Sequence, residues 1–184
     1  MKPANYQQLE LQQQQTFDAS RELGGVFDTL MQARDLASDD AQRRNDCVSK
    51  LGKNLGQSLF QHQRTIRTLQ RHPKYSRHII GKKDEWTGLI CRWEAGSCSS
   101  IHGHPAFTFY HVFGGSFAMD LYDRDVSGQL VISKTHDLEP GDTYWENGDA
   151  GRYDNLIHRV RARHHGYTLM LFSEDPGRGE VYSG

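Results

Sequence analysis

The chain has 184 residues, a formal net charge of −1 and a pI near 6.8. This length suits one domain that buries its own core, or one domain with a helical appendage. The balanced charge argues against nucleic acid or an acidic membrane as a partner, and no apolar run approaches the roughly 20 residues of a membrane-spanning helix. The opening residues lack the apolar stretch of a secretory signal. Three cysteines without C-x-x-C spacing speak against a disulfide framework or a thiolate zinc site, so we expect a soluble cytoplasmic protein.

Residues 1–72 are predicted to form a helical section. They are polar, and "ASDDAQ" offers Ser38, Asp39 or Asp40 as the N-cap of a helix. The Gln-rich opening, Gln12–Gln15, is of low complexity, and we expect the first ~16 residues to be disordered. The apolar residues at helical spacing are Phe17, Leu23, Phe27, Leu30 and Met31, and later Leu55, Leu59, Phe60, Ile66 and Leu69.

Residues 73–184 show a different pattern, that of short strands. Segments such as "TGLICRWEA", "GQLVISKTHDL" and "GYTLMLFSE" are rich in β-branched and aromatic residues and are separated by Gly, Pro, Asp and Asn. The turn Pro140-Gly141-Asp142 opens a long connection. The simplest architecture is a mainly β protein, in which an antiparallel barrel packs against the N-terminal helical section.

The stretch "GSCSSIHGHPAFTFYHVFGG", Gly96–Gly115, places two histidines one residue apart. On a strand, His102 and His104 project from the same face and can form one edge of a metal site. His158, on another predicted strand, is the candidate for a third ligand, whereas His111 is expected on the opposite face from His104. From the residues alone, a pair of ordinary surface histidines remains the competing interpretation.

The spacing G-x5-H-x-H, followed by Gly115, a P-G-D turn and a later histidine, resembles the two motifs of the cupin superfamily. Gly96, His102, His104 and Gly115 fall at the positions of the first motif, and the glycines suit tight barrel corners. Thr108 falls where the acidic ligand usually stands and cannot take its place. The resemblance implies a cupin-type antiparallel β-barrel, the double-stranded β-helix, and the missing acidic ligand fits the thiol dioxygenase branch best.

Over roughly Pro73–Pro176 the chain resembles cysteine dioxygenase in three separated segments in the right order. These are "YSRHII", "CRWEAGSCSSIHGH" and "NLIHRVRARHHGYTLMLFSEDP". The resemblance implies a mononuclear Fe(II) ion held by His102, His104 and His158 without a carboxylate. The implied reaction inserts both oxygen atoms of O2 into a thiol and gives a sulfinate.

The resemblance also assigns the walls of a substrate pocket. Arg77 matches the arginine that holds the substrate carboxylate, a role that suits the fork of a guanidinium group; a surface arginine in a basic segment is the alternative. Tyr75 and Trp93 match pocket-wall positions, although both also suit an aromatic core. Cys98 lies in the glycine-rich lead-in, either as a pocket thiol or as a buried free cysteine.

The chain departs from the family on its last strand, where a Ser-His-Tyr relay usually faces the iron. Thr168, Met170 and Phe172 stand at those positions, and the phenyl ring of Phe172 cannot donate a hydrogen bond. Phe109 and Phe172 occupy the positions of a Cys–Tyr crosslink, which is therefore excluded. We expect Phe107, Phe109, Met170 and Phe172 to make the pocket apolar. The candidates for a replacement hydroxyl are Tyr153, Tyr167 and Tyr182.

The sequence thus predicts an Fe(II)-dependent thiol dioxygenase that acts on cysteine or a related small thiol carboxylate. Its expected partners are this thiol and O2, with no nucleic acid and no membrane, and the expected state is a monomer or weak homo-oligomer. Two alternatives stay open: another cupin metalloenzyme that acts on a non-thiol small molecule, and a binding module without turnover that takes up a metal or small molecule.

Overall fold

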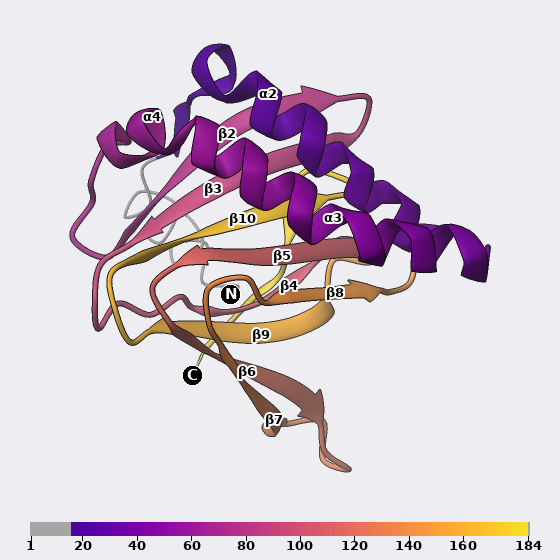
Figure 1. Ribbon diagram of the computed structural model, residues 1–184. Coiled ribbons are helices and arrows are strands. Elements are labelled where there is room, and N and C mark those ends of the chain that lie inside the picture. The colour runs from indigo at the N-terminus through magenta and orange to yellow at the C-terminus, as the bar shows by residue number, and fades with distance from the viewer. Residues whose placement is uncertain (1–15, 184) are drawn as a thin grey trace.

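The computed structural model describes residues 16–183, and the Gln-rich opening, Gln12–Gln15, lies outside the described residues. An N-terminal helical section packs on a body of two β-sheets that are antiparallel apart from one short pair of strands (Figure 1). The predicted mainly β architecture with an N-terminal helical section is confirmed. The helices end at Thr68 and the first barrel strand begins at Tyr75, on either side of the predicted boundary at residue 73.

The helical section consists of α2 (Ser20–Leu30), the 3-10 helix η1 (Met31–Ala37), α3 (Ala41–Gln61) and α4 (Gln63–Thr68). Asp40 is the N-cap of α3, because its carboxylate accepts hydrogen bonds from the backbone N–H groups of Gln42 and Arg43. This outcome selects one of the three predicted caps. None of the described helices is long and apolar enough to cross a membrane.

One strand interrupts the predicted helical section. Phe17, expected on a helix, lies in β1 (Thr16–Asp18), which pairs in parallel with β2 at the edge of a sheet. The carboxylate of Asp18 accepts a hydrogen bond from the backbone N–H of Ser20 at 2.9 Å. Such a local bond favours a turn, and α2 begins directly after it.

The strands form two sheets. In spatial order, the six-stranded sheet contains β1, β2 (Tyr75–Lys83), β3 (Trp86–Trp93), β10 (Gly166–Phe172), β5 (Phe107–Gly114) and β8 (Thr143–Asn147). The five-stranded sheet contains β11 (Val181–Tyr182), β4 (Ile101–His104), β9 (Asn155–Ala162), β6 (Phe117–Arg124) and β7 (Leu130–Leu138). From β3 to β11 the chain moves back and forth between the sheets, which is the course of a double-stranded β-helix.

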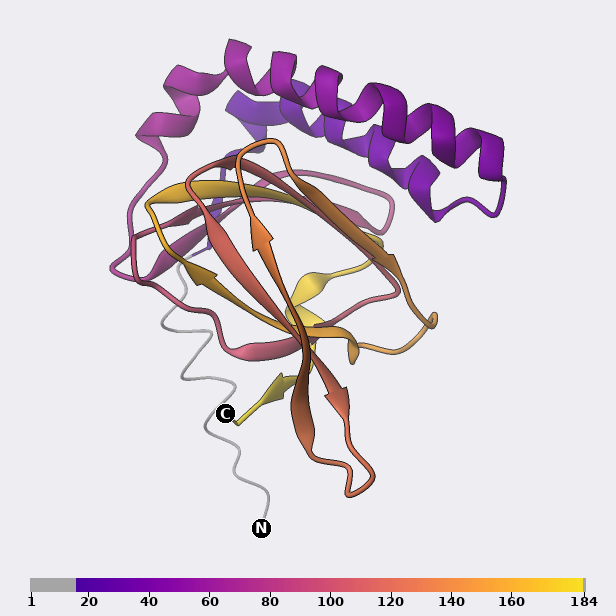
Figure 2. The ribbon, with the colours of Figure 1, turned by 60° about the horizontal axis from the view of Figure 1, so that its bottom comes forward.

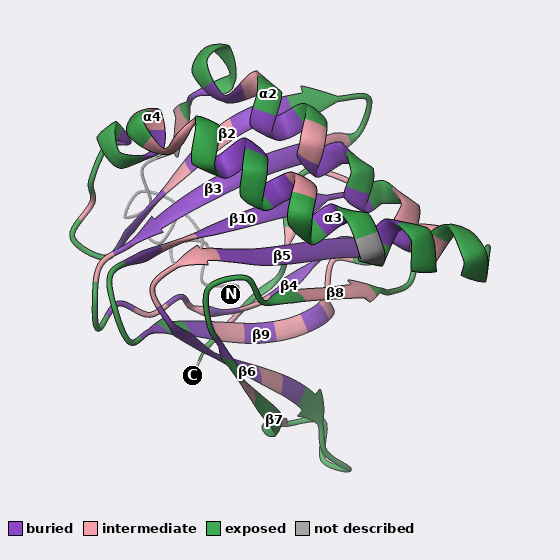
Figure 3. Ribbon diagram, viewed as in Figure 1, coloured by how far each residue is buried: buried purple, intermediate pink, exposed green. Residues whose placement is uncertain are grey.

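Two apolar clusters lie on the two faces of the six-stranded sheet. Because side chains alternate along a strand, Phe107 and Phe109 of β5 pack toward the helices, whereas Tyr110 and Val112 point into the barrel. The predicted orientation of His111 follows the same rule, since its strand neighbour Leu169 belongs to the helix-side cluster. Figure 3 shows the buried strands beneath the helices, and Figure 2 shows the β6–β7 hairpin projecting away from them. The barrel interior, enclosed by both sheets, is therefore free to hold a site.

Candidate metal centre

Three histidines meet inside the barrel. His102 and His104 lie on β4, and His158 lies directly opposite His102 on the neighbouring strand β9. The register shifts between His102 and His104, and Leu156 of β9 has a positive φ of 44°, a conformation that a bulky residue rarely adopts. The ring centroids of all three pairs are 4.7 Å apart, and the candidate ligand atoms lie within 4.8 Å of one another. The strand register therefore gathers three imidazoles around one point.

Backbone carbonyls fix the orientation of two of these rings. Nδ1 of His102 lies 3.0 Å from the carbonyl oxygen of Ser100, and Nδ1 of His158 lies 3.1 Å from that of Leu156. A carbonyl only accepts, so Nδ1 carries the proton and donates in both cases. Nε2 of each ring thereby keeps its lone pair, which is how protein frameworks present histidines to metals. On His158 this lone pair accepts a hydrogen bond from Tyr110, which a bound metal would displace.

The third ring, His104, has no hydrogen-bond partner for either of its buried nitrogens among the described residues. It stacks on Phe172, with ring centroids 5.1 Å apart. Burial lowers the pKa of His102 to about 4, and burial together with the neighbouring rings lowers the pKa values of His104 and His158 well below 6.5. All three imidazoles are therefore neutral near pH 7. Neutral, converging and partly unpartnered ring nitrogens fit a divalent transition-metal ion such as Fe(II).

Tyr110 supplies a hydroxyl that the sequence analysis missed. It extends from β5 into the barrel and is buried, and its hydroxyl lies 3.0 Å from Nε2 of His158. Burial raises the pKa of Tyr110 well above 10, so the phenol keeps its proton and donates to that nitrogen. Thr108, at the position of the acidic cupin ligand, is also buried and lies two residues away on the same strand. Because residues i and i+2 of a strand share a face, the position of Thr108 could have indicated that Tyr110 also faces the site.

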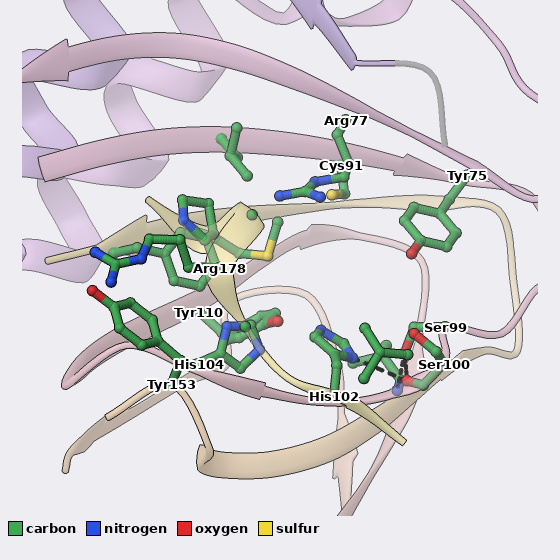
Figure 4. A pocket seen from close by; sticks show the side chains of 18 of the residues that line it. Tyr75, Arg77, Cys91, Ser99, Ser100, His102, His104, Tyr110, Tyr153 and Arg178 are labelled. Carbon is green, nitrogen blue, oxygen red and sulfur yellow. Dashed lines mark hydrogen bonds between the residues drawn. The ribbon is translucent and has the colours of Figure 1, made fainter. Parts of the chain in front are cut away.

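A pocket of about 480 Å³ opens onto the histidines, and Figure 4 shows its labelled residues. His102 and His104 form one wall, on the five-stranded sheet, and Arg77 of β2 extends from the facing sheet. Among the described residues, the guanidinium of Arg77 has no acidic partner and donates no hydrogen bond. Five of the residues predicted for the substrate site line this pocket, namely Tyr75, Arg77, Trp93, Met170 and Phe172.

Three other residues predicted for the pocket, Cys98, Phe107 and Phe109, are not among those that line it. Phe109 points to the helices because of the alternation along β5. Cys98 lies in the loop before β4, bridged to Arg161, with its Sγ 3.2 Å from the carbonyl oxygen of Ser99. The cysteine that does line the pocket is Cys91, and burial raises the pKa of its thiol to about 12.

The three residues of β10 that stand where the thiol dioxygenases carry their relay have other roles here. The hydroxyl of Thr168 accepts a hydrogen bond from Nε1 of Trp93 at 2.9 Å and so holds a pocket wall in place. Of the three tyrosines considered as replacements, Tyr153 lines the pocket, whereas Tyr167 and Tyr182 do not. The hydroxyl of Tyr153 donates to Glu174 rather than toward the histidines.

The C-terminal segment closes part of the pocket, another feature that the sequence analysis did not predict. The 3-10 turn η2 (Pro176–Arg178) and Gly179 line it, and β11 pairs with β4 next to His102. The backbone N–H of Gly103 donates to the carbonyl oxygen of Glu180 at 2.8 Å. We call residues 174–182 the strap. Its short strand carries too few residues for a recognisable sequence pattern.

No protein-family model matches the chain. Among solved structures, it is similar to a cupin superfamily protein from Desulfitobacterium hafniense, with 16% sequence identity, a TM-score of 0.43, and coverage of 58% of this chain and 83% of that one. It is also similar to an RmlC-like cupin from Shewanella frigidimarina, with 17% identity, a TM-score of 0.43, and coverage of 59% and 82%. For KdgF from Halomonas sp. the values are 17% identity, a TM-score of 0.42, and coverage of 56% and 82%.

Proposed function

We propose that this protein is an Fe(II)-dependent thiol dioxygenase that converts a small thiol carboxylate to its sulfinate. The reaction adds both atoms of O2 to the sulfur of R–SH and gives R–SO2H. One observation carries the proposal: three neutral histidines converge without a carboxylate, and two of them, His102 and His104, share a pocket with Arg77.

The iron would be held by His102, His104 and His158, and when bound it supplies a place where sulfur and O2 react. Three neutral ligands do not offset the charge of a divalent ion, which favours an anionic thiolate over a neutral donor. The choice of Fe(II) over other metals is part of the proposal.

Arg77 would orient the substrate. Its guanidinium has no competing carboxylate among the described residues and matches the geometry of a bidentate carboxylate. Held there, the thiol carboxylate presents its sulfur toward the histidines on the facing wall.

Other pocket residues would control water and protons. Met170 and Phe172 cover the side of the site where a polar relay was expected, so they keep water from it. Tyr110 is placed to donate a hydrogen bond to a group bound beside His158, because its hydroxyl already reaches Nε2 of that ring.

The direct test is oxygen uptake. Protein loaded anaerobically with Fe(II) is mixed with cysteine, 3-mercaptopropionate or cysteamine, and O2 consumption and product mass are recorded. We expect uptake with the carboxylate-bearing thiols and a product heavier by two oxygen atoms. Arg77→Gln should raise KM for these thiols and leave that for cysteamine, which has no carboxylate, unchanged. Absence of O2 uptake with every thiol would refute the proposal.

A second candidate is a metalloenzyme that acts on a non-thiol small molecule. The observation that favours it is the position of Phe172, which stacks on His104 where a hydroxyl-bearing side chain was expected. Native protein that carries stoichiometric nickel, manganese or zinc and consumes no O2 would support this candidate over the first.

We also propose a cytoplasmic location and a monomer or weak homo-oligomer. The three cysteines are all free, which suits a reducing compartment. Analytical ultracentrifugation at micromolar concentration would test the oligomeric state.

A further inference from the structure

The pocket contains a second guanidinium, that of Arg178, on the strap (Figure 4). We infer that the substrate carries two anionic groups, one bound by Arg77 and the other by Arg178. This inference deepens the proposed function and rests on it for the assignment of this pocket as the substrate site.

The charge of the pocket wall supports an anion with more than one charge. Two arginines line the pocket, and none of its described lining residues is Asp or Glu. A ligand with a single carboxylate leaves one guanidinium unmatched, and a cationic ligand is repelled by both.

The side chain of Arg178 is 62% exposed, but its guanidinium stacks on a ring rather than extending freely into solvent. Its guanidinium lies over the ring of Tyr153, 4.0 Å from the ring centroid. The backbone beneath it is fixed, because Asp175 accepts a hydrogen bond from the N–H of Gly177 at 2.8 Å and β11 pairs with β4. A stacked guanidinium keeps its N–H edge available for an acceptor, and its ordering reduces the entropy lost on binding.

Glu174, the acid paired with Arg178, does not occupy all the hydrogen-bond donors of its guanidinium. Nη1 of Arg178 lies 3.8 Å from the carboxylate of Glu174, a long contact, and that carboxylate also accepts the hydroxyl proton of Tyr153. Among the described residues, the guanidinium of Arg178 donates no hydrogen bond, and its one acidic contact is that with Glu174. An incoming carboxylate can therefore gain direct bonds from Arg178 that Glu174 does not make.

The size of the pocket fits a ligand that reaches both arginines. Its volume of about 480 Å³ lies within the roughly 300–1,000 Å³ of pockets that enclose whole small molecules. Apolar side chains also line this pocket, including Leu89, Val160 and Met170. The inferred substrate is thus a thiol with two carboxylates, or a carboxylate and another anionic group, joined by an apolar chain.

The test measures binding without turnover. Calorimetry on the full chain, free of thiol and under nitrogen, compares succinate, glutarate and adipate with hexanoate, the single-carboxylate partner of adipate. We expect at least one dicarboxylate to bind, and Arg178→Gln to weaken that binding about tenfold while hexanoate changes less than about twofold. Arg77→Gln should weaken both kinds of ligand.

Arg43→Gln is the matched control, since Arg43 lies on α3 with its partner Asp35 and outside the pocket. Thermal melting of each variant checks that the fold is intact. Failure of every dicarboxylate to bind, or equal binding to wild type and Arg178→Gln, would overturn the inference. Because no oxidation takes place in this assay, a negative oxygen-uptake result and a negative binding result are separate outcomes.

Discussion

Tyr110 is the only hydroxyl among the described residues that hydrogen-bonds one of the three histidines. It reaches them from β5 on the six-stranded sheet, whereas the histidines stand on the five-stranded sheet. A buried phenol that keeps its proton is a hydrogen-bond donor in a dry environment, where such a bond is stronger than in water. It can replace, from a different strand, the hydroxyl that Phe172 lacks.

The Tyr110→Phe variant should therefore retain the metal and have a lower kcat. We expect metal content within about twofold of wild type, since no ligand is removed, and a fall in kcat of about 10–100-fold, the usual effect of a group that supports metal ligands. The visible spectrum of the Co(II)-loaded protein should shift, because the hydroxyl beside Nε2 of His158 is lost. Tyr167→Phe, outside the pocket, should change neither quantity. Loss of metal in Tyr110→Phe would instead identify a structural role.

The convergence of the three histidines could be predicted from sequence because strand alternation and the resemblance in the spacing both pointed to them. Tyr110 was missed although strand alternation from Thr108 places it on the same face of β5. Arg178 gave no such signal. It lies on a turn without periodicity, and only the pairing of β11 with β4 brings it to the pocket.

At the scale of elements, β4 positions His102 and His104, and it packs closely between the strap and the loop before β9. A Cβ added at Gly103 would lie 2.6 Å from Cα of Asp154 and 2.6 Å from the carbonyl oxygen of Tyr153. Both are backbone atoms and cannot move aside cheaply. The residue between the two ligand histidines must therefore be glycine.

Gly103→Ala should lower the free energy of unfolding by about 1–3 kcal/mol, the usual cost of overpacking, and should weaken metal binding by displacing His102 and His104. Urea unfolding and metal titration would measure the two effects. Gly52→Ala on α3 is the control, because nothing lies within 4 Å of the added Cβ. In an exposed helix this control should stabilise by about 0.5–1 kcal/mol. Equal behaviour of the two variants would contradict the close packing of β4.

The elements themselves were predictable to different degrees. The long helices and the cap at Asp40 follow from apolar periodicity and capping chemistry. The strands β1 and β11 do not, because three and two residues are too few to show alternation. Both form only because a sheet edge is available, which is tertiary information.

At the scale of the whole molecule, buried histidines determine the response to acid. Burial lowers the pKa values of His102 and His111 to about 4, whereas an unfolded histidine titrates near 6.5. Between these values the unfolded chain binds protons that the folded chain excludes, so stability falls as pH decreases through this window. The carboxylates with lowered pKa values, such as Asp120, lose their stabilising charge mainly below this window.

Metal-free protein should show a constant free energy of unfolding above about pH 7 and a steep decline from pH 6.5 to 4. One pKa unit corresponds to about 1.4 kcal/mol, so each such histidine contributes on the order of 3 kcal/mol to the decline. Urea titrations at pH 7.5, 6, 5 and 4.5 would measure it. His111→Phe, which removes a buried histidine outside the metal site, should flatten the curve by that amount. A pH-independent midpoint in wild type would show that the histidines are solvated.

The three histidines stand on two adjacent strands of one sheet, while Arg77 belongs to the facing sheet and Arg178 to the strap. In the proposed enzyme, the residues that would hold the ion and those that would bind the substrate thus lie on different segments of the chain. Mutations on β2 or in the strap can exchange one substrate for another without touching the ligands, and the ligands can be inherited unchanged. With this division, the proposed metal chemistry could be kept during evolution while the substrate changed.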